Sequence, residues 1–179
     1  MTRTEEREQA FVLIFEKEFN MDTSMDDIIS YAAEADVFSE SAFASSLAKA
    51  VFENIDAVDA VIDKYSIGWK KSRLPKTTLA ILRLAICEMM FVDSIPESVS
   101  INEAVELAKA YGTDQSASFV NGVLGKIARS EELPGEDLYQ ELLAEDRARE
   151  EAQAAEAAAK VAVAQAEAGV LDEDAEVAE

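Results

Sequence analysis

The run LAILRLAICEMMFV, residues 79–92, is apolar on nearly every side of a helix. A helix that is hydrophobic all round is buried among its neighbours, whereas a surface helix carries a single apolar stripe. Only Arg83 and Glu88 interrupt the run, and it is too short to span a bilayer. Pro75 stands shortly before it, where a first helical residue is tolerated. These residues predict a central buried helix.

The sequence before this run also has the pattern of α-helices. Apolar residues open a first helix at positions 10–15, and Ser24 predicts the N-cap of a second. Phe43, Leu47, Val51 and Ile55 then recur every four residues. That spacing predicts one amphipathic helix of about five turns across residues 43–62.

The chain after the run predicts two more helices. Ser100 and Glu103 form an S-x-x-E pattern that predicts a capping box, and Gly112 predicts the end of that helix. Thr113 or Asp114 caps a last helix that runs through Ile127. Two glycines of this last helix, at 122 and 125, suggest a close approach of a helix or of a ligand backbone. Since no stretch shows the alternating apolar and polar residues of a β-strand, the predicted fold class is all-α.

Charge and composition divide the chain near residue 130. Residues 1–130 hold 13 basic and 21 acidic side chains, a net charge of −8, whereas residues 131–179 hold 3 and 16, a net charge of −13. We therefore predict a folded domain over 1–130 and an acidic Ala/Glu-rich extension over 131–179. The extension is expected to be helical over 137–168 and frayed beyond Gly169. It serves either as a solubilising tail or as a regulatory arm that competes for a basic surface.

Several classes of function are disfavoured by what the sequence lacks. There is no histidine, which is the commonest general base and metal ligand. The single cysteine, Cys87, lies in the central apolar run, so we expect an inert core thiol in a reducing cytoplasm. The N-terminus does not resemble a signal peptide. We predict a cytoplasmic binding protein with no catalytic site, no metal and no cofactor.

One segment differs from the acidic average of the chain. Residues 64–87 contain six basic side chains and no acidic one, with Tyr65 and Trp69 among them. Because charges beyond a Debye length of about 8 Å are largely screened, such a patch can bind phosphate on an acidic protein. The alternative is a loop whose lysines merely face water.

Two longer stretches carry a resemblance to a known family. The run INEAVELAKAYGTDQSASFVNGVLGKIA, residues 101–128, strongly resembles the C-terminal signature of the NusB family of bacterial transcription antitermination factors. The run RLPKTTLAILRLAICEM, residues 73–89, resembles the helix before that signature. The opening REQAFVLIFE, residues 7–16, resembles the first helix of the family. Residues 131–179 have no counterpart in the pattern.

The resemblance implies a fold, a function and partners. The fold is a helical bundle of two three-helix halves. The function is binding of single-stranded boxA RNA together with the ribosomal protein NusE, within the RNA polymerase complex that reads through terminators in ribosomal RNA operons. Some relatives are dimers that mask the RNA surface, so the resemblance also leaves a homodimer open.

Matching this chain to the family's pattern, together with the basic segment, gives a set of candidate RNA-binding residues. The family uses an arginine-rich N-terminal segment and the aromatic of its F-V-N-G run, which correspond here to Arg3, Arg7 and Phe119. Guanidinium groups hold phosphate while an aromatic face stacks an unpaired base. The full candidate set is Arg3, Arg7, Lys70, Lys71, Arg73, Lys76, Gln115 and Phe119.

Two alternatives stay open at this point. Arg3 and Arg7 can simply pair with Glu6 and neighbouring carboxylates, and Phe119 can be an ordinary core aromatic. The chain can also be a helical protein-interaction module that has lost RNA binding, because Glu5 and Glu6 interrupt the arginine segment and the extension is acidic.

Overall fold

The computed structural model describes residues 1–35, 41–92, 94–130, 151, 154–155 and 157–161 of the chain, and within them it is all-helical, as predicted. The elements are α1 (Arg3–Lys17), α2 (Met25–Glu34), α3 (Ala42–Glu53), α4 (Ile55–Tyr65), a short 3-10 helix η1 (Lys71–Arg73), α5 (Lys76–Phe91), α6 (Glu97–Tyr111) and α7 (Asp114–Ala128).

The chain divides into two units, Met1–Leu142 and Leu143–Glu179. In the second unit, residues 151, 154–155 and 157–161 are helical and exposed. The rest of the helix predicted over 137–168, and the fraying predicted beyond Gly169, lie outside the described residues.

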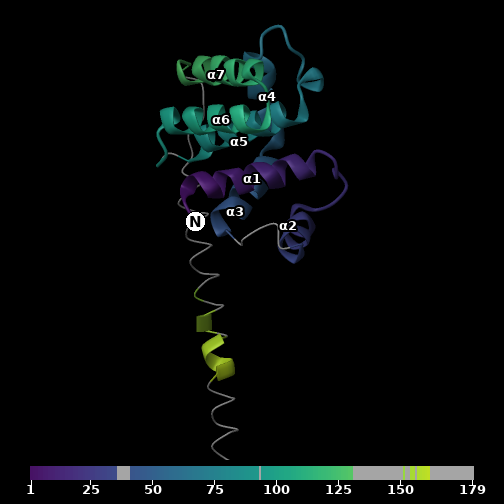
Figure 1. Ribbon diagram of the computed structural model, residues 1–179, viewed down its shortest axis with the longest axis vertical. Coiled ribbons are helices and arrows are strands. Elements are labelled where there is room, and N and C mark those ends of the chain that lie inside the picture. The colour runs from purple at the N-terminus through teal and green to yellow at the C-terminus, as the bar shows by residue number, and fades with distance from the viewer. Residues whose placement is uncertain (36–40, 93, 131–150, 152–153, 156, 162–179) are drawn as a thin grey trace, which may run out of the picture. The chain divides into compact units, whose positions relative to one another are not determined.

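The first unit contains two groups of helices that share α5. Helices α1, α2 and α3 pack on one another, α4, α6 and α7 pack around α5, and α5 also contacts α1 and α3. In Figure 1, α6 lies between α7 and α1. The predicted arrangement in two halves is confirmed, with one helix more than predicted.

Helix α5 is the buried centre of this unit. Every residue from Thr78 to Met90 is buried, and Leu82, Ile86 and Cys87 are fully inaccessible. Burial raises the pKa of the Cys87 thiol far above its ordinary value, which keeps it protonated and unreactive. The prediction of a central buried helix is confirmed.

The extra helix comes from a break at Asn54. The single helix predicted over 43–62 is wrong, because α3 ends at Glu53 and α4 begins at Ile55. The Asn54 side chain donates to the carbonyl of Ala50 over 2.9 Å, so it competes with the helical backbone at the junction. Val51 and Val58 are buried on either side of the break, which is why the apolar repeat gave no sign of it.

The capping box predicted at Ser100 and Glu103 is also wrong. Helix α6 begins at Glu97, directly after Pro96, so both residues lie inside the helix. Ser100 is 1% exposed and faces α5, where its hydroxyl donates to Glu88. The spacing S-x-x-E therefore marks a face of α6 that meets α1 and α5, not a helix start.

Other helix ends agree with the sequence. The Ser24 side chain accepts from the backbone N–H of Asp27 over 3.1 Å and caps α2, and Thr113 caps α7. Helix α6 ends at Tyr111 and Gly112 is its C-cap, where a Cβ would lie 2.8 Å from the carbonyl oxygen of Ala108. A side chain at this position would force the backbone to shift.

The close helix approach proposed for the two glycines of α7 is not observed. A Cβ added to Gly122 meets nothing within 4 Å, and one added to Gly125 meets only the Arg129 side chain, at 3.4 Å. Gly122 therefore leaves open space on the surface of α7. Within the described part of the chain, no helix is long and apolar enough to span a membrane.

The central role of α5 gives a first prediction. Leu82→Ala should lower the free energy of unfolding by about 2–5 kcal/mol, because a fully buried leucine leaves a cavity in a helix packed on all sides. The matched control is Ile67→Ala, since Ile67 is 75% exposed and its truncation should change stability by less than about 0.5 kcal/mol. Urea unfolding followed by circular dichroism measures both, and equal costs would contradict the central position of α5.

Candidate nucleic-acid interface

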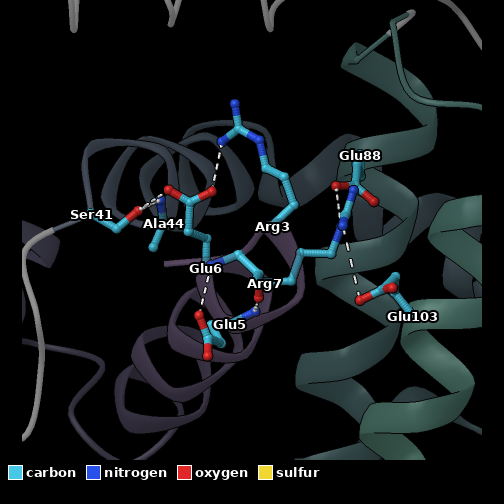
Figure 2. Close-up of polar contacts among 9 residues, drawn as sticks. Arg3, Glu5, Glu6, Arg7, Ser41, Ala44, Glu88 and Glu103 are labelled. Atoms are coloured by element: carbon cyan, nitrogen blue, oxygen red, sulfur yellow. Dashed lines mark hydrogen bonds and ion pairs between the residues drawn. The ribbon is translucent and has the colours of Figure 1, made fainter.

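The start of α1 is fixed by its own acidic residues. Thr2 and Glu5 form a capping box, in which the Thr2 N–H donates to Glu5 over 2.6 Å and the Glu5 N–H donates to the Thr2 hydroxyl over 3.3 Å. Hydrogen bonds from Thr2 lower the pKa of the Glu5 carboxyl. Figure 2 shows that Glu6 turns toward α3, where it accepts from the Ser41 hydroxyl over 3.0 Å. Both carboxylates that interrupt the arginine segment therefore have structural partners.

Arg3 lies at the edge of this cluster and remains partly accessible. Its Nη1 donates to Glu6 over 2.9 Å, and its guanidinium carbon lies 4.1 Å from the centre of the Phe43 ring. The side chain is 45% exposed. Surface ion pairs of this kind contribute at most about 1 kcal/mol, so the guanidinium can exchange Glu6 for a phosphate at small cost.

Arg7, one helical turn further, lies in the interior. It is 5% exposed, and its Nε donates to Glu88 Oε1 over 2.8 Å (Figure 2). Its Nη1 lies 3.9 Å from Glu103 Oε2 on α6. Arg7 therefore pairs with carboxylates, which was the alternative to RNA binding. Because it is buried, its guanidinium group is not accessible to a phosphate.

The basic segment before α5 likewise contains cations that are paired with carboxylates and cations that are exposed. Lys71 Nζ lies 2.6 Å from Asp59 Oδ2, and Lys76 Nζ lies 2.9 Å from Glu18 Oε2. The buried Arg83 binds both carboxylates as well, donating to Asp59 over 2.8 and 2.9 Å. Burial raises the pKa of Asp59 even though the Lys71 hydrogen bond acts in the opposite direction, and burial lowers the pKa of Arg83 to about 10. These cations mainly neutralise the buried Glu18 and the partly buried Asp59.

Lys70 and Arg73 are the exceptions in this segment. Both are exposed, and among the residues that the structure describes neither forms an ion pair. Lys70 directly precedes the 3-10 helix η1, and Arg73 is the last residue of η1, shortly before α5. Of the segment's predicted contacts, these two are the most available to a phosphate.

Phe119 lies on α7 and faces the same segment. It is half-buried, and its ring centre lies 6.2 Å from that of Trp69, with the ring planes at 65°. Gln115, one turn before Phe119 on α7, lines the cavity between the two rings. Phe119, Gln115 and the segment 70–76 therefore come together, whereas Arg3 has its contacts on α1 and α3.

Trp69 was missing from the candidate residues. The sequence carried one signal for it, because the only tryptophan of the chain lies in its longest acid-free basic segment. Trp69 is 56% exposed, which is unusual for so large an apolar ring. In the described part of the chain, no cluster of His, Cys, Asp and Glu side chains could hold a metal ion.

These features define an all-helical protein in which the exposed ring of Trp69 and the half-buried ring of Phe119 lie together, and the segment that carries Trp69 also carries two exposed cations. Comparison with known proteins identifies its family. Residues 4–129 match the model of the NusB family. Two relatives named transcription antitermination protein NusB are 43% identical over 136 residues (Agathobacter rectalis, 72% of this chain and 100% of the relative) and 44% identical over 130 residues (Acetivibrio thermocellus, 72% and 90%). The chain belongs to the NusB family.

Solved structures agree on the fold. NusB of T. maritima is 34% identical, with a TM-score of 0.67, over 75% of this chain and 94% of that one. A crystal structure of antitermination factors NusB and NusE in complex with double-stranded RNA matches with a TM-score of 0.63 at 23% identity, over 72% and 98%. At that identity the second likeness concerns the fold alone.

The two arginines of α1 give the second prediction. Arg7→Ala should lower the free energy of unfolding by about 3–5 kcal/mol, because it leaves Glu88 buried without its cation. Arg3→Ala is the matched control and should cost less than about 1 kcal/mol. Urea unfolding of the two variants decides the point. If Arg7→Ala were as stable as the parent protein, Arg7 would be available for RNA after all.

Proposed function

We propose that this chain is a transcription antitermination factor that binds single-stranded boxA-type RNA together with the ribosomal protein NusE. In this role it joins the RNA polymerase complex that reads through terminators in ribosomal RNA operons, acting in the cytoplasm. Membership of the NusB family, with relatives named for antitermination at 43% and 44% identity, carries the proposal. The function is one of binding rather than catalysis.

The surface formed by α7 and the segment before α5 supports the RNA-binding part. Phe119 and Trp69 offer ring faces for unpaired bases, and Lys70 and Arg73 offer uncommitted cations for the phosphates between them. Arg3 adds a second, partly exposed guanidinium on α1. We assign the remaining candidates Arg7, Lys71 and Lys76 mainly to holding the helices together, because each is paired with a carboxylate.

A helical protein-interaction module without RNA binding is the alternative function. It rests on the acidic extension and on the pair Glu5 and Glu6, whose charges would repel a phosphate backbone. Both carboxylates accept hydrogen bonds within the fold, so the structure gives them another role. This observation favours the RNA-binding proposal over the alternative.

The third prediction concerns RNA affinity. Full-length protein should bind boxA-type RNA weakly alone and more tightly with NusE. If two to four phosphates are neutralised, the logarithm of affinity should fall against the logarithm of salt concentration with a slope of about −1.4 to −2.8. Phe119→Ala should weaken binding by about 1–3 kcal/mol through loss of a stacked base. Fluorescence anisotropy with labelled RNA measures these quantities.

Tyr31→Ala is the control for this experiment. Tyr31 is also an aromatic on an exposed surface, 62% accessible, but it lies on α2. Its truncation should leave RNA binding unchanged. Absence of RNA binding by the parent protein, with NusE present, would favour the protein-interaction module.

The acidic extension gives the fourth prediction. Removing residues 131–179 takes away a net charge of −13 and should strengthen RNA binding at low salt. The difference should vanish at 1 M salt, where the Debye length is about 3 Å. Titration of full-length and truncated protein at both salt concentrations tests this. Equal affinities at low salt would leave the extension a solubilising role only.

A further inference from the structure

A cavity of about 170 Å³ lies between the loop before α5 and the first turns of α7. Its walls include the rings of Trp69 and Phe119, together with Leu74 and Pro75. At about 30 Å³ per water molecule, the volume equals five or six waters. That is the scale of one planar heterocycle, well below the 300–1,000 Å³ of typical sites for larger ligands.

The two rings are oriented to take one flat group rather than two. Their planes meet at 65° with centres 6.2 Å apart, an edge-to-face arrangement. A planar group stacked on one ring is therefore inclined by about 65° to the other ring. Such a pair forms a corner that holds a single base, since a base cannot be sandwiched between rings that are not parallel.

Trp69 is held in place before any ligand arrives. Gly68 adopts a φ of 85°, a conformation that side chains rarely accept, and so lets the chain turn at this point. The Trp69 N–H donates to the carbonyl of Ser66 over 3.0 Å, and the buried Ser66 hydroxyl donates back to the Trp69 carbonyl over 3.0 Å. Because the backbone N–H and C=O of Trp69 are both hydrogen-bonded, the entropic cost of ordering its backbone on binding is small.

The polar lining of the cavity also suits a base. Gln115 and Ser116 on α7 bring an amide and a hydroxyl, which can both donate and accept. Thr78 is 1% exposed, and its Oγ1 has no hydrogen-bond partner among the described residues. Since buried polar groups are almost always paired, the unpaired Thr78 hydroxyl at the cavity wall is a feature that the fold alone does not explain.

The charges around the cavity favour an anionic ligand. None of the described residues that line it is acidic, in a chain with a net charge of −21. Lys70 follows Trp69 directly, and Arg73 precedes Leu74. The chain next to the lining residues therefore carries these two exposed cations and one acidic residue, Asp114, a net positive charge.

We propose that the cavity between Trp69 and Phe119 captures one unpaired base of the bound RNA, with Trp69 as a second stacking platform beside Phe119. This inference rests on the proposed RNA-binding function and makes it specific. One nucleotide of the RNA is read in the cavity, and the neighbouring phosphates lie against Lys70 and Arg73.

The fifth prediction uses the fact that Trp69 is the only tryptophan of the chain. A base stacked on an indole quenches its fluorescence, so titration of the full-length protein with boxA-type RNA should quench Trp69. Anisotropy of labelled RNA measures binding independently. Trp69→Ala should weaken binding about 5- to 160-fold, the range for one stacked base, whereas Trp69→Phe should retain most of the affinity.

The matched control is Ile67→Ala, an exposed apolar residue of the same loop, which should bind RNA like the parent protein. RNAs that each carry one abasic position then locate the captured base. In the parent protein one position should cost more than the others, and in Trp69→Ala that extra cost should disappear.

Three results would overturn the inference. RNA binding that leaves Trp69 fluorescence and the affinity of Trp69→Ala unchanged would remove the cavity from the interface while the proposed function stands. Quenching by NusE in the absence of RNA would assign the surface to a protein partner. No binding of RNA by the parent protein, even with NusE, would overturn the proposed function and this inference with it.

Discussion

The buried carboxylate of Glu88 is the constraint on which the first unit depends. It lies in the last turn of α5, 1% exposed, where an unpaired charge would cost several kcal/mol. Arg7 from α1 donates to one of its oxygens over 2.8 Å, and Ser100 from α6 donates to the other over 2.5 Å. One acidic residue thereby fixes how two further helices lie against the central one.

A second buried charge on α5 acts in the same way at the other end of α1. Arg83 binds Glu18, directly after α1, and Asp59 on α4, and Lys76 and Lys71 complete the pairing of these carboxylates. The cations that hold the helices together are therefore unavailable to RNA. Of the predicted candidates, Arg3, Lys70 and Arg73 are exposed cations outside these pairs, and the last two lie in the segment that carries Trp69. The interior charges thus decide which surface can bind nucleic acid.

The sequence predicted the helical elements well where local signals act. Ser24, Thr113 and Gly112 mark helix ends because capping and glycine geometry depend on neighbouring residues. The sequence predicted helix ends and residue roles poorly where contacts with residues distant in the chain determine them. Ser100 and Glu103 looked like a cap but serve α5 and α1, and the break at Asn54 was hidden because both helices bury the same face. The sequence predicted Arg7 as an RNA contact and did not predict Trp69 for the same reason, because burial against α5 and exposure beside α7 are properties of the packed fold.

Photo-crosslinking of boxA-type RNA that carries 4-thiouridine to the full-length protein, with NusE present, tests most directly where nucleic acid binds. The crosslinked peptides are identified by mass spectrometry. A surface built by the loop before α5 and by α7 predicts crosslinks in the peptides that contain Trp69 and Phe119. Crosslinks confined to residues 1–17, with none in those two peptides, would contradict it and return the RNA site to the arginines of α1.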